Sequence, residues 1–202
     1  MVPAVLLGMY VVMFVLLGIA PYDRAVWVTE NLPIVGIVLM LVLTWRHFRF
    51  SNGAYLLMAF LVFLHTIGGH YTFERVPFDW VTELFHFQRN HYDRMAHFTV
   101  GFYAFPCAEF LLRRRLVSSR LVLLLFPIFF IMSVAAGYEL FEWQYAVLAD
   151  SEAGIAVLGS QGDIWDAQKD MLADTLGAIF ATGFFAMIHW RELPVGIEAK
   201  PA

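Results

Sequence analysis

Four aspartates, Asp163, Asp166, Asp170 and Asp174, follow one another at spacings of three and four residues near the end of the chain. An α-helix turns by about 100° per residue, so the four carboxylates fall on one stripe of a helix. An apolar segment that ends near Trp190 follows directly. A carboxylate in hydrocarbon costs about 3 kcal/mol or more, so it faces the protein interior and has a partner. The stripe therefore predicts an interior polar site whose partners come from other helices.

Further acidic and imidazole side chains have helical spacing. Asp93 and His97 stand at positions i and i+4, and Glu139 and Glu142 at i and i+3, so each pair shares one face of its helix. Both pairs lie toward the same end of their apolar segments as the aspartate stripe, and His65 lies in a third segment. Groups from four segments are therefore predicted to converge in one band just below the outer membrane surface.

Such a concentration of carboxylates constrains the chemistry. Like charges a few ångströms apart cannot all stay ionised in a low-dielectric site, so either several are protonated or a cation neutralises them. Oxygen ligands with one or two imidazoles suit a divalent metal ion, and spacing alone does not choose among Mg, Mn, Ca, Zn and Fe. We expect such an ion to serve a membrane enzyme that hydrolyses or modifies a lipid-linked or envelope substrate. A metal-bound water would be the nucleophile, and a nearby carboxylate or His97 would be the base.

The residues of this predicted site divide into three sets. The predicted metal ligands are His97, Glu139, Glu142, Asp170 and Asp174, and the predicted catalytic residues are Asp93, His97 and Asp166. Asp93 is expected to orient His97. The predicted surrounding residues are His65, His91, Tyr92, Arg94, Gln144 and Asp163.

The two pairs with helical spacing, Asp93 with His97 and Glu139 with Glu142, can also be explained without a metal ion. Asp93 and His97 are expected as a hydrogen-bonded pair if no metal binds. Glu139 and Glu142 would then form buried ion pairs with Arg94 or Arg89.

Three other acids have local explanations. Asp163 is expected as a helix N-cap, and Asp166 shares the benefit of a first-turn carboxylate. Glu109 stands four residues before Arg113, and we expect an i, i+4 ion pair.

Two further classes of function remain open. Carboxylates inside a membrane also mark ion pathways, which indicates an ion- or proton-coupled transporter. A buried polar network that fixes helix register indicates a structural or assembly protein. Motifs of other chemistries, such as His-Glu-x-x-His, Gly-x-Ser-x-Gly and a phosphate-binding glycine loop, are absent from the sequence.

The composition is that of an integral membrane protein. Hydrophobic residues make up 60% of the 202 residues, aromatic ones 17% and charged ones only 15%. A formal net charge of -4 is not the basic footprint of a nucleic-acid-binding protein, so membrane lipids are the expected surroundings. The single cysteine, Cys107, excludes an intrachain disulfide and a cysteine-based zinc site.

The apolar segments predict an all-α, polytopic membrane bundle of about six transmembrane helices in a single domain. No lysine or arginine precedes the first segment, so we expect it to be retained as a span rather than cleaved as a signal peptide. The polar stretch from Tyr71 to Asn90 carries regularly placed aromatic residues and suits an amphipathic helix in the interface. The predicted spans cover about 2–20, 32–45, 54–69, 92–112, 121–144 and 166–190.

Charged residues in the connecting loops are divided between the two sides. The positive-inside rule makes the arginine-rich side cytoplasmic, which places both termini in the cytoplasm and predicts a bacterial inner (plasma) membrane protein. That side carries Arg46, Arg49, Arg113, Arg114, Arg115, Arg120 and Arg191. The opposite loops carry Asp23, Glu30, Glu74, Asp79, Glu83, Asp150, Glu152 and Asp163.

Three motifs resemble those of the YjdF-like family of uncharacterised bacterial inner-membrane proteins. They are His91–His97, Tyr138–Glu142 and Gln161–Asp170. This resemblance covers most of the chain from the second span onward and implies location, since the family brings no established activity. More loosely, the order of polar residues resembles the VanZ-like membrane proteins, without the arginine that family carries between Gln144 and Asp166. That pattern maps onto Asp93, His97, Glu139, Glu142, Gln144, Asp166, Asp170, Asp174 and Gly177.

Overall fold

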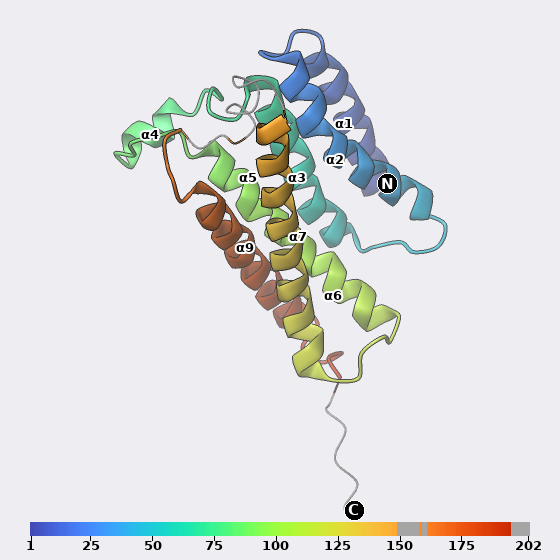
Figure 1. Cartoon of the computed structure of the whole chain (residues 1–202). Helices are drawn as coiled ribbons and strands as arrows, with labels where there is room; N and C mark the ends of the chain where they lie inside the picture. The colour runs from blue at the N-terminus through green and yellow to red at the C-terminus, as the bar shows by residue number, and fades with distance from the viewer. Residues whose placement is uncertain (149–157, 159–160, 195–202) are drawn as a thin grey trace, which may run out of the picture.

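The computed structural model describes residues 1–148, 158 and 161–194, and these contain helices and no strand. Figure 1 shows an elongated bundle in which the long helices run roughly side by side. In chain order the helices are α1 (Val2–Gly18), α2 (Arg24–Thr44), α3 (Asn52–Tyr71), α4 (Asp79–Leu84), α5 (Tyr92–Val100), the 3-10 turn η1 (Gly101–Tyr103), α6 (Ala104–Arg113), α7 (Arg120–Leu148) and α9 (Asp166–Ile188).

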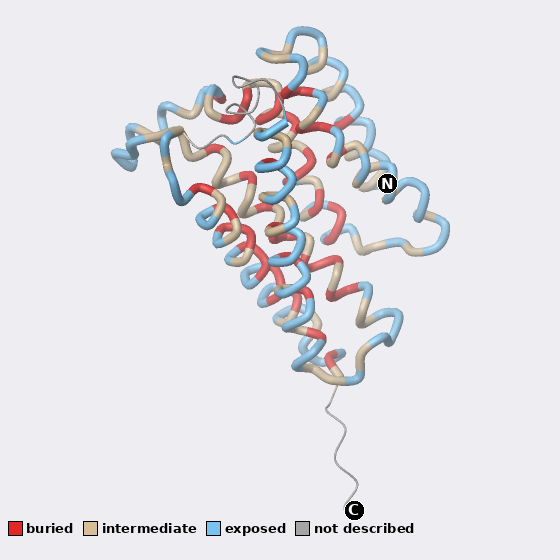
Figure 2. Tube along the Cα trace, viewed as in Figure 1, coloured by how far each residue is buried: buried red, intermediate tan, exposed pale blue. Residues whose placement is uncertain are grey.

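Five helical segments are long and apolar enough to cross a membrane. One of them joins α5, η1 and α6 into a single span, and α1 is a shorter apolar helix of 17 residues. The outward sides of these helices are exposed in the isolated chain (Figure 2), and the exposed side chains on α7 include Phe126, Phe129 and Phe130. Lipid therefore surrounds the bundle, and the prediction of an all-α, multi-pass membrane protein is confirmed.

The second span begins earlier than its hydropathy predicts. The Asp23 side chain accepts hydrogen bonds from the backbone N–H groups of Ala25 and Val26, at 2.7 and 2.9 Å, and so caps α2 at Arg24 instead of near residue 32. This adds two turns of helix that carry Glu30 and Asn31 into the interior. The prediction that Glu30 lies in an outer loop is therefore wrong, because a side-chain cap starts a helix regardless of hydropathy.

The arginine-rich end is held by a second capping arrangement. Ser51 caps α3, and its backbone N–H and hydroxyl both donate to the buried Glu109 carboxylate, at 2.8 and 2.7 Å. Arg113 Nη1 lies 2.6 Å from the same carboxylate, which confirms the predicted i, i+4 pair. Glu109 thus ties the start of α3 to the end of α6.

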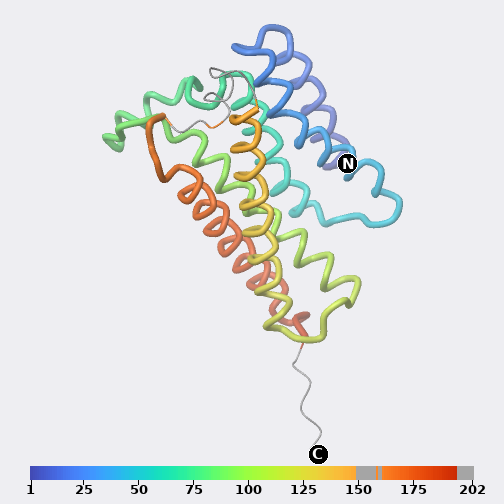
Figure 3. The backbone as a smooth tube through the Cα atoms, in the orientation of Figure 1, coloured from blue at the N-terminus to red at the C-terminus, as the bar shows by residue number. Residues whose placement is uncertain are grey.

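The tightest helix crossing joins the central span to α9. A Cβ on Gly177 would overlap the carbonyl oxygen of Phe98, and a Cβ on Gly101 would overlap the backbone of Gly177 and Ala178. Only glycine permits backbones to approach so closely within a membrane. The crossing sets α5 against the first half of α9, which is the part that carries the aspartate stripe (Figure 3).

The segment predicted as one interfacial helix is mostly irregular. Thr72 and Phe73 adopt positive φ values of 58° and 52°, which ends α3 and folds the Phe73 ring over Gly68. Only Asp79–Leu84 forms a helix, α4, and its Trp80 side chain is 67% exposed. The exposed aromatic side chains still suit an interfacial position.

Candidate functional site

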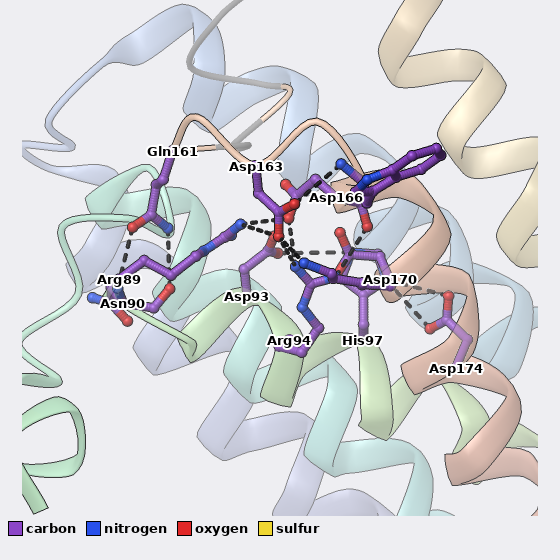
Figure 4. A network of polar contacts seen from close by, with 12 residues as sticks. Arg89, Asn90, Asp93, Arg94, His97, Gln161, Asp163, Asp166, Asp170 and Asp174 are labelled. Atoms are coloured by element: carbon purple, nitrogen blue, oxygen red, sulfur yellow. Dashed lines mark hydrogen bonds and ion pairs between the residues drawn. The ribbon is translucent and has the colours of Figure 1, made fainter. Parts of the chain in front are cut away.

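Helices α5 and α9 bring the predicted aspartates and His97 together near the acidic end of the bundle (Figure 4). His97 Nδ1 lies 3.3 Å from both carboxylate oxygens of Asp174, which is only 1% exposed. His97 Nε2 lies 3.7 Å from Asp93 Oδ1 and 3.9 Å from Asp170 Oδ1. One imidazole therefore stands between three carboxylates, with a different partner at each nitrogen.

The distances around His97 favour one tautomer. A carboxylate accepts hydrogen bonds, so a hydrogen bond from His97 to Asp174 requires the imidazole proton to be on Nδ1. That proton leaves the lone pair of Nε2 directed toward Asp93 and Asp170, which are too distant for hydrogen bonds. Ligand atoms of Asp93, His97 and Asp170 all lie within 4.8 Å of one another. In metal-binding histidines, a carboxylate typically accepts a hydrogen bond from one ring nitrogen while the other ring nitrogen faces further metal-ligand atoms.

The sequence-based hypothesis made Asp174 a ligand and Asp93 the group that orients His97. In the structure Asp174 is the carboxylate nearest Nδ1, at 3.3 Å, and Asp93 lies 3.7 Å from Nε2. The predicted ligand and orienting roles of these two residues stay predictions.

A group of ion pairs borders this cluster. Arg89 Nη1 and Arg94 Nη2 lie 2.6 and 2.5 Å from the same oxygen of Asp166. Arg94 Nη1 also lies 2.9 Å from Asp170 Oδ1, and Lys169 Nζ lies 2.6 Å from Asp163 Oδ2. Asp166 thus anchors the start of α9 to α5 through arginines, which also suits a structural role for its carboxylate.

The charges of this group do not balance. Asp166, Asp170 and Asp174 are at most 6% exposed, so their charges need compensation from within the protein. With His97 neutral and all five aspartates ionised, five carboxylates meet three cationic side chains, which leaves an excess of two negative charges within this group. The group consists of Asp93, Asp163, Asp166, Asp170 and Asp174 with Arg89, Arg94 and Lys169.

A second polar group lies beside the first, and its central residue was missed by the sequence analysis. The buried Glu30 carboxylate accepts a hydrogen bond from the Tyr138 hydroxyl at 3.0 Å and lies 3.1 Å from His65 Nε2. The Tyr138 ring centroid lies 6.3 Å from that of His65 and 6.5 Å from that of His97, so Tyr138 stands between the two groups. His65 lies inside an apolar span, where a histidine needs a polar partner. The sequence signal that could have identified Glu30 as that partner was Asp23, a helix-capping residue that starts α2 before Glu30.

The two glutamates of α7 are not among the three residues whose ligand atoms lie within 4.8 Å of one another. Glu142 is 8% exposed, and the Oε1 atom of Glu139 is buried without a hydrogen-bond partner among the described residues. The ion pairs described for Arg94 join it to Asp163, Asp166 and Asp170 rather than to either glutamate. Their predicted role as ligands stays a prediction.

The other predicted surrounding residues have environments of their own. Gln144 is exposed, and the buried Tyr92 hydroxyl donates to the Leu64 carbonyl at 2.9 Å. Burial, with the neighbouring Arg89 and Arg94 guanidinium groups, lowers the pKa of His91.

Asp163 is close to the start of α9 but is not its N-cap. Trp165 holds that position, since α9 begins at Asp166, and Asp163 instead accepts a hydrogen bond from the Trp165 N–H at 3.1 Å. The predicted cap is therefore wrong by position, because a turn separates Asp163 from the first helical residue.

The pair of Asp163 and Lys169 predicts a pH-dependent contribution to stability. The hydrogen bond from Lys169, together with that from the Trp165 N–H, lowers the pKa of Asp163 below its ordinary value of 3.8. The stabilisation is therefore complete above that ordinary value and is lost as the pH falls through the lower value of the folded protein. We expect Lys169→Met to lower the melting temperature slightly at pH 6, with the difference from wild type shrinking as the pH falls below 3.8. Melting curves at a series of pH values test this, and a difference that does not shrink below pH 3.8 contradicts it.

Comparisons with known proteins agree with the membrane architecture. Residues 2–191 match the family model described as "Predicted membrane protein (DUF2238)". The chain is 35% identical over 182 residues to the inner membrane protein YjdF of Escherichia coli (strain K12), covering 87% of this chain and 85% of that protein. No solved structure matches the chain significantly. The predicted inner-membrane location is confirmed by this relative, while the looser resemblance to VanZ-like proteins stays a prediction. The chain belongs to the DUF2238 family of predicted membrane proteins.

Proposed function

We propose that this membrane protein binds a divalent metal ion through Asp93, His97 and Asp170, and that the ion serves hydrolysis or modification of a lipid-linked or envelope substrate. The observation that carries the proposal is the setting of His97. Its Nδ1 faces Asp174 at 3.3 Å, while its Nε2 faces two carboxylate oxygens at 3.7 and 3.9 Å, beyond hydrogen-bond distance.

The donor set fits a divalent ion. Two carboxylate oxygens and one imidazole nitrogen suit Zn, Mn or Fe, whose bonds to such atoms are about 2.0–2.2 Å long. Two ligand atoms of one ion are then at most about 4.0–4.4 Å apart. The two separations measured from Nε2 already lie within that limit, so side-chain movements of a fraction of an ångström would complete the site.

The charge of the site supports the same proposal. The group beside His97 has more carboxylates than cationic side chains, which favours a bound cation. Arg94 pairs with Asp166 and also with the Asp170 oxygen that faces His97 Nε2, so a bound ion would share the Asp170 carboxylate with this arginine. A bound ion would remove a like-charge repulsion that otherwise costs several kcal/mol in a low-dielectric interior.

Each residue then has a distinct task. Asp93, His97 and Asp170 would hold the ion, and Asp174 would fix the imidazole orientation through Nδ1. Arg94, which lies 2.9 Å from the same Asp170 oxygen, would share that carboxylate with the ion. A divalent ion so held activates water or polarises a carbonyl or phosphoryl oxygen, which is the chemistry that the hydrolysis of lipid-linked substrates requires.

Metal analysis of the protein purified without chelator tests the proposal. We expect about one equivalent of a divalent metal in the wild type, and at least about tenfold less in His97→Ala and Asp170→Asn. Asp174→Asn is expected to weaken binding by about 10–100-fold, as loss of an orienting carboxylate does. Glu83→Gln, which removes an exposed acid on α4, is the matched control and should keep its metal. Equal metal content in wild type and the ligand variants would refute the proposal.

A second candidate function is a structural one, favoured by the arginine pairs of Asp166. Arg89 and Arg94 lie 2.6 and 2.5 Å from one of its oxygens, and such a network can fix the register of α5 against α9 without any ligand. In that case His97→Ala and Asp170→Asn lower the melting temperature, while the wild-type protein contains no bound metal.

A further inference from the structure

A cavity of ≈ 380 Å³ lies between α1, α2 and α3, away from the polar site. Its lining includes Leu7, Val38, Ala59 and Phe63, and it contains no charged residue. Cavities of about 300–1,000 Å³ are the usual size of small-molecule sites. The cavity is therefore large enough for part of an apolar ligand.

The cavity arises from the way the first two helices meet α3. Near the acidic end, α1 and α2 are held together by the Phe14 and Trp27 rings, whose centroids lie 5.4 Å apart, and by Arg24 Nη1, 3.3 Å from the Gly18 carbonyl oxygen. Both helices pack on α3 (Figure 1). Toward the arginine-rich end the cavity opens between them, and α3 forms its floor.

The cavity extends along α2 and α3. Its lining extends on α2 from Val38 to Trp45 and on α3 from Tyr55 to Phe63. At 1.5 Å per residue this is about 10 Å, most of the roughly 15 Å of hydrocarbon in one leaflet. The buried Tyr10 lines it on α1. A ligand that fits is therefore an extended hydrocarbon chain lying parallel to the helices.

Positive charge stands at one end of the cavity. Trp45 lines that end, Arg46 follows it directly, and the Arg49 guanidinium lies 5.2 Å from the Trp45 ring centroid. Both arginines are exposed. They lie where the headgroup of a lipid would be if its chain entered the cavity, and they match a phosphate-bearing anionic headgroup.

From these observations we propose that the cavity between α1, α2 and α3 is a binding site for one acyl chain of an anionic phospholipid, whose headgroup binds Arg46 and Arg49. This site is independent of the metal site, because it uses other helices and the opposite end of the bundle. It would make one lipid a fixed component of the protein, distinct from the lipids that surround it.

Native mass spectrometry of the detergent-purified protein, titrated with phosphatidylglycerol or phosphatidylcholine, tests the site. We expect one tightly bound phosphatidylglycerol per chain, held about 20-fold more tightly than phosphatidylcholine, since each arginine near a lipid headgroup is worth about fivefold. The double variant Arg46→Gln with Arg49→Gln should remove this preference. Arg115→Gln, an exposed arginine at the same end, is its control and should keep it.

Filling the cavity tests the acyl-chain part separately. Ala59→Phe should lower phosphatidylglycerol binding at least about tenfold, because loss of only a few buried methylenes has that effect. The smaller Ala59→Leu tests the same point if the phenylalanine variant does not fold. Ser133→Phe, which enlarges an exposed side chain on α7, should bind as the wild type does. Undiminished binding in folded Ala59 variants, or equal affinity of the wild type for the two lipids, would overturn the proposal.

Discussion

Gly177→Ala is expected to destabilise the protein by about 3 kcal/mol or more, at or beyond the upper end of ordinary overpacking. The added Cβ would overlap the carbonyl oxygen of Phe98, a backbone atom that cannot rotate away as a side chain can. The helices α5 and α9 would have to separate, and Asp170 and Asp174 would move away from His97. We therefore expect a lower melting temperature together with loss of metal binding, measured by thermal unfolding and metal analysis.

Gly183 supplies a matched control on the same helix. A Cβ at Gly183 meets no heavy atom within 4 Å, so Gly183→Ala adds the same methyl group without a clash. Alanine is favoured over glycine in a helix by about 0.5–1 kcal/mol, so this variant should be as stable as the wild type or slightly more stable. If Gly177→Ala and Gly183→Ala have the same melting temperature, the close crossing at Gly177 is not a feature of the folded protein.

Arg94→Met is the second change with a large expected effect, a loss of about 3–5 kcal/mol in the free energy of unfolding. It removes the ion pairs to Asp166 and Asp170, which are 6% and 3% exposed, and leaves both carboxylates with less compensation. It also removes the 3.0 Å hydrogen bond to the Asp166 carbonyl oxygen. Thermal unfolding measures the loss, and Arg115→Met, at an exposed position, should leave the melting temperature unchanged.

The same variant separates the two candidate functions. Removal of Arg94 leaves the three proposed ligand residues in place, frees Asp170 from its ion pair and makes the site more negative, so metal affinity should be kept or should rise. Adding Asp166→Asn should recover part of the lost stability, because it removes one of the two buried carboxylates that lost the Arg94 guanidinium. Loss of metal in a folded Arg94→Met protein would contradict the assignment of the ligands, and failure of the double variant to recover stability would contradict the ion pair.

The sequence predicted the helical membrane architecture because long apolar segments have few alternatives in a bilayer. It also predicted that Asp93, His97, Asp170 and Asp174 share one membrane depth, since depth follows from counting residues along a helix. Which nitrogen of His97 faces which carboxylate could not be predicted. That depends on the rotation of α5 against α9, which the contact of Gly177 with Phe98 determines.

Two residues, Glu30 and Asp163, were placed wrongly because local sequence rules do not give contacts between helices or the exact start of a helix. Glu30 was placed in a loop because hydropathy starts the second span near residue 32, whereas the Asp23 cap starts the helix at Arg24. Its partners His65 and Tyr138 come from two other helices, and pairings between helices are not encoded by local spacing. Asp163 was likewise placed by a local rule for helix starts, and a turn of the chain moved the cap to Trp165.

The central claim, that the carboxylates around His97 hold a cation, is tested most directly by an experimental structure of the protein purified without chelator. The account predicts a density peak within about 2.0–2.6 Å of Asp93, His97 Nε2 and Asp170, with Asp174 still on Nδ1. A structure that shows His97 Nε2 hydrogen-bonded directly to one of these carboxylates, with no ion between them, would contradict it.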